Sequence, residues 1–385
     1  MAIVPYKLND KDQLILDDIT ARITSSLDAW YGSGARLEVA EPEIRSYRFC
    51  FIFRYPISIS TNEKKAILVK VRRHPKMDSL WQALAADIHQ VSPMEYSSLE
   101  NMFNWLAGVD DDFGVIRPLE YFEQYSAIVM EEYPSRTLKQ LLMKARSSSN
   151  GTGTSELEEA ARKAGKLLRY FHYDIYVPTA TSYSTNDILN DVLTYANQIE
   201  NYTHRRVAAK SIVDSFTQKL ENIQINSMLF SMTHADLTAD NILYSADGKV
   251  CLIDIKARLA PIYSDIGLLI INPETYKQQI LTGGLYLPAS LLKKYREAIL
   301  AGYFEGQPRE KFFIKLFSAL KVLEKWNMYE ELMSRYKGIK YLLSIPIGPW
   351  VTIYFQHLLK KQLDSIHSSK VRQVFKVVEP EDPTA

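Results

Sequence analysis

The sequence predicts an α+β chain of two lobes, on three observations. Its 385 residues are many for one compact core. Segments rich in β-branched and aromatic residues concentrate before residue 132, whereas apolar residues at helical spacing dominate from residue 133. A segment at residues 231–267 gathers Asp, Asn and His around a short hairpin. We therefore expect a first lobe over residues 1–132, a helical second lobe over residues 133–378 and a disordered tail over residues 379–385.

Composition and charge exclude several classes of protein. Hydrophobic residues make up 46% and charged residues 24% of the chain, which is ordinary for a folded protein. A net charge of +1 gives no basic field, so we expect no nucleic-acid partner. Cys50 and Cys251 are too few for a disulfide framework or a zinc cluster. No signal peptide or apolar run of bilayer length is present, so we expect a cytoplasmic protein without a membrane span.

The first lobe is expected to combine one helix with a sheet. Asn9 or Asp10 can cap a helix whose apolar residues recur every three or four positions. Strand-like segments rich in Phe, Ile, Val and Tyr cover residues 36–41, 47–55, 66–72, 115–122 and 125–132. Residues 42–46 are expected to connect the first two strands.

The second lobe is expected to be mainly helical. Helical spacing is clearest over residues 135–146, 155–171, 291–304, 310–333 and 351–365, with two more helices between residues 186 and 225. His172 is expected to be a packing residue rather than a catalyst. Most aromatic residues of the later helices are expected in the core. Four of them could instead stack on a sugar: Tyr303, Trp326, Tyr329 and Trp350.

The segment near the middle carries the candidate chemistry. It contains the pattern H-x-D-x-x-x-x-N, with His234, Asp236 and Asn241 at its fixed positions, and a hairpin with an Asp-Gly turn then leads to Asp254. Phosphoryl transfer needs a carboxylate beside the attacking hydroxyl and oxygen ligands for Mg²⁺. One Asp and one Asn suit Mg²⁺, because this ion keeps water and phosphate oxygens as its other ligands. The alternative is an ordinary turn rich in Asp and Asn.

These residues resemble the aminoglycoside phosphotransferase-like branch of the protein-kinase-like superfamily. That branch has H-G-D-x-x-x-x-N-I-L, then a strand ending in Ile-Asp and a later Asp-Ile/Leu-Gly/Ala. The matching stretches here end at Leu243, Asp254 and Gly267. Ala235 replaces the usual Gly, and Ile-Lys follows Asp254 where protein kinases have Phe-Gly. That difference and the lack of an Ala-Pro-Glu segment favour a small-molecule kinase over a protein kinase.

The resemblance implies a bilobal protein-kinase-like fold and a role for each matching residue. Asp236 is the implied catalytic base, and Asn241 and Asp254 are the implied Mg²⁺ ligands. Asp265 is the implied brace of the catalytic loop. Residues 42–46 stand where a glycine-rich loop would cover the nucleotide, although they contain no glycine.

Lys70 is the expected phosphate-binding cation. It ends the pattern Ile-Leu-Val-Lys, which resembles the V-A-I-K strand whose Lys grips the α and β phosphates. The alternative is a solvated strand end, as is also considered for Arg72 and Arg73. Residues 93–102 are expected to open a helix, and Glu95 in it is the expected carboxylate partner of Lys70. Glu100 and Asp87 are the other candidates for that partner.

Residues 128–134 resemble the hinge whose backbone meets the adenine edge, and Glu131 and Tyr133 are assigned to the nucleotide site on that basis. We therefore expect a phosphotransferase that uses ATP and Mg²⁺. The expected acceptor is a hydroxyl of a small molecule, and the 24 Tyr, the 5 Trp and the balanced charge favour a sugar or glycan. The alternatives are a catalytically silent kinase-like scaffold, an aminoglycoside- or choline-type kinase, and a protein kinase.

Overall fold

The computed structural model describes most of the chain: residues 6, 8–39, 41–47, 49–60, 63–74, 77, 79–85, 91–148, 152–204, 206–221, 223–307, 311–335 and 339–366. The expected tail, residues 379–385, lies outside this part. The chain divides into two compact units. Unit 1 comprises Met1–Arg136 and Leu243–Ala257, and unit 2 comprises Thr137–Ile242 and Arg258–Ala385. The lobe boundaries given above stay a prediction.

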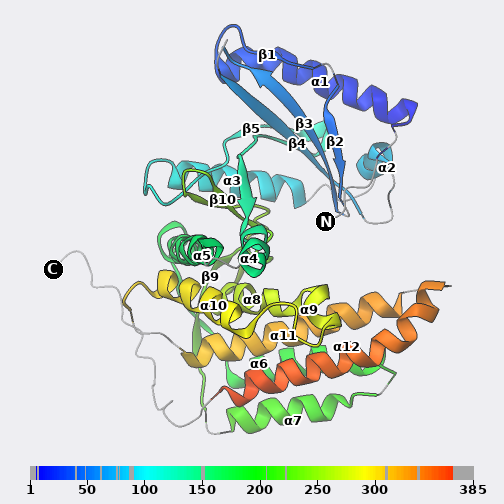
Figure 1. Cartoon of the computed structure of the whole chain (residues 1–385), viewed down its shortest axis with the longest axis vertical. Coiled ribbons are helices and arrows are strands. Elements are labelled where there is room, and N and C mark those ends of the chain that lie inside the picture. The colour runs from blue at the N-terminus through cyan, green and yellow to red at the C-terminus, as the bar shows by residue number, and fades with distance from the viewer. Residues whose placement is uncertain are drawn as a thin grey trace. The chain divides into compact units, whose positions relative to one another are not determined.

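Unit 1 is built on an antiparallel sheet (Figure 1). Its strands are β1 (Arg36–Leu37), β2 (Glu43–Ser46), β3 (Cys50–Ser58), β4 (Lys64–Arg72), β5 (Pro118–Phe122) and β6 (Ala127–Glu131). The order is β1-β3-β4-β6-β5, and β2 also pairs with β3. Alternate residues of β3 and β4 are completely buried, as the period of two in a strand requires.

The buried face of the sheet packs against α1 (Asp10–Tyr31). Asn9 is the N-cap of α1, since its side chain accepts a hydrogen bond from the backbone N–H of Asp12 at 3.0 Å. Leu16, Ile19 and Ile23 of the helix join Phe51 and Phe53 of β3 in one hydrophobic core. The opposite face of the sheet carries Lys70, and this face is therefore the one that can present functional groups.

Two expectations about the first strands are wrong. The strand expected over residues 36–41 is limited to β1. The connection expected over residues 42–46 is instead β2, which pairs with β3 through Ser46 and Phe51. Ile44 and Ser46 lie on the same, more buried face of β2, as the period of two in a strand requires. The strand ends at a turn in which the backbone N–H of Tyr47 donates to the carbonyl of Cys50 at 2.9 Å.

The remaining elements of unit 1 are two helices, a short turn and a second small sheet. The helices are α2 (Leu80–Ala85) and α3 (Val91–Leu106), and a short 3₁₀ turn, η1 (Glu123–Tyr125), joins β5 to β6. A three-stranded sheet in the order β11-β10-β7 is made by β7 (Ser135–Thr137), β10 (Ile242–Ser245) and β11 (Val250–Leu252). The hairpin from β10 to β11 turns at Gly248, whose φ of 80° lies in the left-handed region that favours glycine.

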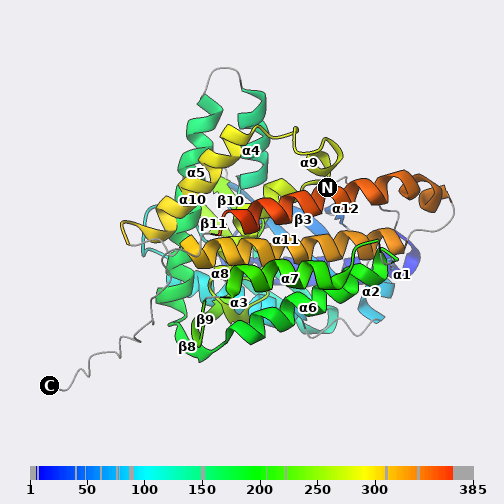
Figure 2. The same cartoon turned by 90° about the horizontal axis from the view of Figure 1, so that it is seen from below.

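Unit 2 is mainly helical. Its α-helices are α4 (Leu138–Ser147), α5 (Thr152–Tyr170), α6 (Thr185–Tyr202), α7 (Ala209–Leu220), α8 (Tyr263–Ile271), α9 (Lys277–Leu281), α10 (Ala289–Phe304), α11 (Lys311–Ser334) and α12 (Ile339–Asp364). A π-helical turn, η2 (Phe171–Ile175), follows α5, and a 3₁₀ turn, η3 (Asn272–Thr275), follows α8. Figure 2 shows α6, α7, α11 and α12 side by side.

A small antiparallel sheet in the order β12-β9-β8 supports the start of the segment at residues 231–267. It consists of β8 (Thr179–Ser182), β9 (Ser227–Thr233) and β12 (Arg258–Pro261). Strand β9 ends immediately before His234, so the small sheet fixes the start of residues 234–241, called the H-x-D loop from here on. Among the described residues, no helix combines the length and apolar character needed to cross a bilayer.

Candidate functional site

Lys70 and Glu95 form a buried ion pair in unit 1. The Lys70 Nζ lies 2.6 Å from the Glu95 Oε1, and the two side chains are only 4% and 7% exposed. Strand alternation in β4 points Lys70 away from the α1 core, and α3 brings Glu95 to it. Glu95 is thus the carboxylate that pairs with Lys70. Glu100 instead bonds to Tyr96, and Asp87 lies outside the described residues.

Asp254 is the third member of this group. The Lys70 ammonium also contacts the Asp254 carboxylate, which follows β11. Burial among protein atoms acts to raise the pKa of Asp254, but the charges of Lys70 and Arg72 outweigh it and lower that pKa to about 2. The pKa of Lys70 is raised, because Asp254 and Glu95 together outweigh its burial. The two groups are therefore both ionised at neutral pH.

The Asp254 side chain nevertheless keeps 40% of its surface exposed, so part of the carboxylate can still meet a ligand. The backbone of Asp254 has a φ of 60°, in the left-handed region that a non-glycine residue rarely adopts. Asp is one of the few residue types that tolerate this conformation. Such strain is often found where a side chain must be aimed at a functional site.

Arg72 and Arg73 are not solvated strand ends, and that interpretation is wrong. Arg72 donates from Nε to the Glu95 Oε2 at 2.7 Å, and its side chain is 15% exposed. Arg73 donates to the backbone carbonyls of Tyr47 and Met77 at 2.7 and 2.9 Å. Both guanidinium groups are therefore bound within unit 1, which the strand pattern alone could not reveal.

The Lys70 face of the sheet also carries an apolar surface that the sequence analysis did not single out. Ile52 pairs with Lys70 across β3 and β4, and Leu68 pairs with Met130 across β4 and β6. Paired residues in antiparallel strands share a face, so Ile52, Leu68 and Met130 lie on the side of Lys70. These three side chains are half-buried, whereas the residues of the opposite face are fully buried.

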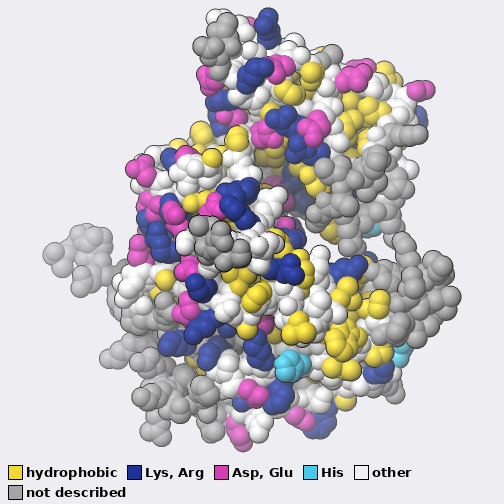
Figure 3. Space-filling view, viewed as in Figure 1, with side chains coloured by type: hydrophobic (Ala, Val, Ile, Leu, Met, Phe, Trp, Pro, Cys, Tyr) yellow, Lys and Arg dark blue, Asp and Glu magenta, His cyan; other side chains and the backbone are white. Residues whose placement is uncertain are grey.

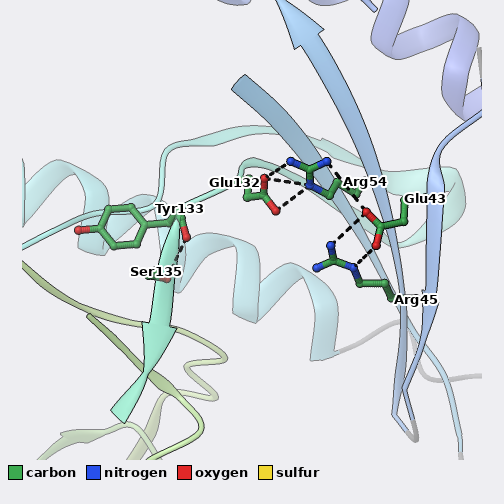
Figure 4. A network of polar contacts seen from close by, with 6 residues as sticks. All are labelled: Glu43, Arg45, Arg54, Glu132, Tyr133 and Ser135. Carbon is green, nitrogen blue, oxygen red and sulfur yellow. Dashed lines mark hydrogen bonds and ion pairs between the residues drawn. The ribbon is translucent and has the colours of Figure 1, made fainter. Parts of the chain in front are cut away.

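The expected hinge residues point in different directions. Glu131 pairs with Ile67 of the buried face, and its carboxylate binds Lys65 at 2.8 Å, so its side chain is not brought to Lys70. Glu132 is held by Arg54, whose Nη2 donates to it at 2.7 Å. Figure 4 shows this pair continuing to Glu43 and Arg45, with the ring of Tyr133 turned away from it. Tyr133 instead packs on Gly114, where a Cβ would lie 1.9 Å from the Tyr133 hydroxyl.

The H-x-D loop belongs to unit 2. Asp265, in the first turn of α8, accepts hydrogen bonds from the backbone N–H groups of His234 at 2.6 Å and Ala235 at 3.2 Å. The bracing that the resemblance implies for Asp265 is thus present. Asn241 donates from Nδ2 to the backbone carbonyl of Asp236 at 2.9 Å, which ties the two ends of the loop. This bond occupies the amide nitrogen, so Oδ1 is the atom of Asn241 that can face a cation.

His172 supports the same loop through Asp265, a function beyond the packing expected for it. Its Nε2 lies 3.1 Å from the Asp265 Oδ2, and its Nδ1 lies 2.9 Å from the Tyr303 hydroxyl. Burial raises the pKa of Asp265, but the hydrogen bond and charge of His172 outweigh it, so that pKa lies below its usual value. Since the ionised carboxylate can only accept, Nε2 of His172 donates to it.

The candidate sugar-stacking residues divide by exposure. Tyr303 is 1% exposed and Trp326 is fully buried, so neither presents a ring to a ligand. The hydroxyl of Tyr329 is bonded to the carbonyl of Thr275 at 3.0 Å. Trp350 is 44% exposed, and α9 and α12 carry three further exposed apolar side chains: Leu281, Ile347 and Ile353. Figure 3 shows hydrophobic side chains gathered over this part of unit 2.

The donor set can be compared with the needs of Mg²⁺. Among the described residues, no group of three or more His, Cys, Asp or Glu could hold a metal ion by itself. Asp254 in unit 1 offers a partly exposed carboxylate, and Asn241 in unit 2 offers an amide oxygen. Each is a type of ligand that suits Mg²⁺, an ion that also takes ligands from phosphate and water.

Comparison with known proteins establishes the fold. No protein-family model matches the chain, and no curated protein sequence matches it. The ethanolamine kinase of Plasmodium vivax matches with a TM-score of 0.51 and 10% identity, over 94% of this chain and 94% of that chain. A glucosamine kinase matches with a TM-score of 0.51 and 12% identity, over 89% of this chain and 83% of that chain. A glucosamine kinase in complex with glucosamine, ADP and inorganic phosphate matches with a TM-score of 0.50 and 12% identity, over 92% of this chain and 84% of that chain. The predicted α+β, bilobal protein-kinase-like fold is confirmed, and the three structures named above are of small-molecule kinases.

Proposed function

We propose that the protein is an ATP-dependent phosphotransferase that moves the γ-phosphoryl group to a hydroxyl of a small molecule. The observation that carries this proposal is the group formed by Lys70, Glu95 and Asp254 in unit 1. A buried Lys that keeps its charge and touches two carboxylates, one of them half-exposed, suits the binding of phosphates next to a divalent cation.

The nucleotide is proposed to lie on the Lys70 face of the sheet. Lys70 would bind the α and β phosphates while Glu95 holds its ammonium in place. Ile52, Leu68 and Met130 would offer a partly exposed apolar surface to the base. Glu131 and Tyr133 would contribute through the backbone of the hinge, since the Glu131 side chain is bound to Lys65.

Asp254 and Asn241 are the proposed ligands of Mg²⁺. When bound, the ion would neutralise charge that spreads over the phosphoryl oxygens during transfer. The contribution of the chain is to present its oxygens in fixed positions. The conformation of Asp254 and the Nδ2 bond of Asn241 both serve that purpose.

Asp236 is the proposed catalytic base, which takes the proton from the acceptor hydroxyl. Its loop is held at one end by Asp265, which binds two successive backbone N–H groups. Asn241 holds the other end through the Asp236 carbonyl. A loop fixed at both ends holds Asp236 in a defined position, which supports the assignment.

The acceptor is proposed to be a sugar or glycan hydroxyl. Two of the structures that share the fold are of a glucosamine kinase, and Trp350 offers an exposed ring on the helices that follow the catalytic segment. A second candidate is an amino alcohol, because an ethanolamine kinase shares the fold to the same degree. A catalytically silent scaffold is disfavoured, because Lys70, Asp236, Asn241 and Asp254 are all present.

The test is transfer of labelled phosphate from MgATP to a panel of sugars, amino alcohols and aminoglycosides. Asp236→Asn should lower the transfer rate at least about a hundredfold, because the proton acceptor is lost, while the Kd for MgATP stays within about threefold. Asp214→Asn, in which an exposed carboxylate on α7 paired with Lys210 is changed, is the matched control and should behave as the unchanged protein. Equal transfer rates for Asp236→Asn and the unchanged protein would show that Asp236 is not the base.

A further inference from the structure

Glu95 is bound by two cations rather than one. Lys70 occupies Oε1 at 2.6 Å, while Arg72 reaches Oε2 with Nε at 2.7 Å and with Nη2 at 2.5 Å. Arg72 lies two residues after Lys70 in β4, so the two side chains leave the strand on the same face. A buried carboxylate needs one cation to balance its charge, and the second one therefore calls for an explanation.

The charges of the whole group supply that explanation. Lys70 is shared between Glu95 and Asp254, so these three residues alone carry one more negative than positive charge. That excess would oppose the phosphates of a nucleotide, which are themselves anionic. Arg72 brings the group to neutrality before a ligand arrives.

Arg72 also fixes the direction of the Glu95 carboxylate. The guanidinium of Arg72 lies against Oε2, to which its Nε donates, and the other carboxylate oxygen is turned toward Lys70. When Lys70 moves part of its hydrogen bonding to phosphate, Glu95 keeps one full partner and stays in place. The low exposure of Arg72 and Glu95 limits competition from water.

We propose that Arg72 is a positioning residue for nucleoside di- and triphosphates, which acts through Glu95 on Lys70 rather than by touching the ligand. This inference rests on the proposed function, because it assigns Lys70 to the phosphates. It predicts that Arg72 matters for ligands with phosphates and not for adenosine.

The test measures the Kd of ATP, ADP and adenosine, each with Mg²⁺, by titration calorimetry. Arg72→Met should weaken ATP and ADP about tenfold and leave adenosine within about twofold, since one charged hydrogen-bond pair is lost. Arg72→Lys, which restores the charge, should recover part of that affinity. Arg22→Met, which removes an α1 arginine paired with Asp18, is the matched control and should change none of the three values.

A double-mutant cycle separates positioning from direct contact. With Glu95→Gln in place, adding Arg72→Met should weaken ATP by less than about twofold, because the residue through which Arg72 acts has already been altered. A full tenfold further loss in that background would overturn the inference, and so would unchanged ATP affinity in Arg72→Met alone. If Arg72→Met does not fold, Arg72→Gln, which also removes the charge, takes its place in the same comparison. Failure of the unchanged protein to bind ATP would instead contradict the proposed function itself.

Discussion

Ala235 occupies a backbone conformation that suits glycine better. Its φ is 64°, and it stands where the resembling family has Gly in the H-G-D pattern. An L-residue in the left-handed region costs roughly 1–2 kcal/mol, and glycine avoids this cost. Part of that gain is lost, because glycine has greater conformational freedom in the unfolded chain. The strain is held by Asp265, which binds the backbone N–H of Ala235.

Ala235→Gly is therefore expected to raise the free energy of unfolding by about 0.5–1 kcal/mol, measured by urea denaturation. Ala239→Gly, in the same loop, is the control. Ala239 is fully buried and is not among the residues with positive φ, so this change should lower stability by about 1 kcal/mol. A loss of stability in Ala235→Gly would show that the left-handed backbone is not strained.

Single residues differ in how far the sequence alone could place them. Lys70 and Glu95 were predicted to pair because strand alternation and a nearby helix with a carboxylate limit the choice, and the structure joins them. The sequence alone did not predict the contacts of Arg72 and His172. Their roles depend on partners far along the chain, such as Asp265, which lies 93 positions from His172. Local periodicity carries no information about such pairs.

At the scale of elements, α5 and α10 approach closely because two glycines remove the side chains between them. A Cβ on Gly165 would lie 2.1 Å from the carbonyl of Ile299, and one on Gly302 would lie 1.8 Å from the carbonyl of Arg162. Each glycine thus meets the backbone of the other helix, which cannot move without shifting the whole helix. The helix η2, which follows α5 directly, carries His172, so this contact also supports the brace of the H-x-D loop.

Gly302→Ala is expected to lower the free energy of unfolding by about 2 kcal/mol or more, because α10 must move away from α5. The matched control is Gly348→Ala in α12. There an added Cβ meets only the Arg206 guanidinium at 3.6 Å, so the better helix propensity of Ala should raise stability by up to about 1 kcal/mol. Thermal unfolding followed by circular dichroism gives both values. If Gly302→Ala leaves the stability unchanged, or raises it as Gly348→Ala does, the two helices do not approach as closely as the structure indicates.

Elements were predictable where a local signal was complete. The hairpin from β10 to β11 follows from its Asp-Gly turn, and β4 follows from its alternation. Strand β2 was missed because its four residues follow a proline and lack a long alternating run. The segment is a strand because it pairs with β3. Such pairing depends on the partner strand as well as on the segment's own sequence.

For the whole molecule, the division into units separates residues that are continuous in the sequence. Asp236 and Asn241 belong to unit 2, whereas Asp254 belongs to unit 1 together with Lys70 and Glu95. The sequence motif presents them as one segment, whereas in the structure β11 bridges to Phe113 and Asp254 belongs to unit 1. The overall α+β class was predictable, because it depends on where strand and helix patterns concentrate along the chain.

The last prediction concerns the stability of the entire chain in the presence of nucleotide. A ligand that binds the folded state alone adds about 2.7 kcal/mol when its free concentration is about 100 times its Kd. MgATP should therefore raise the unfolding midpoint by several degrees. Lys70→Met should abolish that shift, because the phosphates lose the ammonium that Glu95 holds. Asp254→Asn should remove the difference between ATP with Mg²⁺ and ATP with EDTA, since the oxygen charge proposed to hold the ion is gone. Asp236→Asn should retain the full shift, because a proton acceptor is not needed for binding. If Lys70→Met is stabilised by MgATP as much as the unchanged protein, the nucleotide phosphates bind elsewhere, and the group formed by Lys70, Glu95 and Asp254 has a purely structural role.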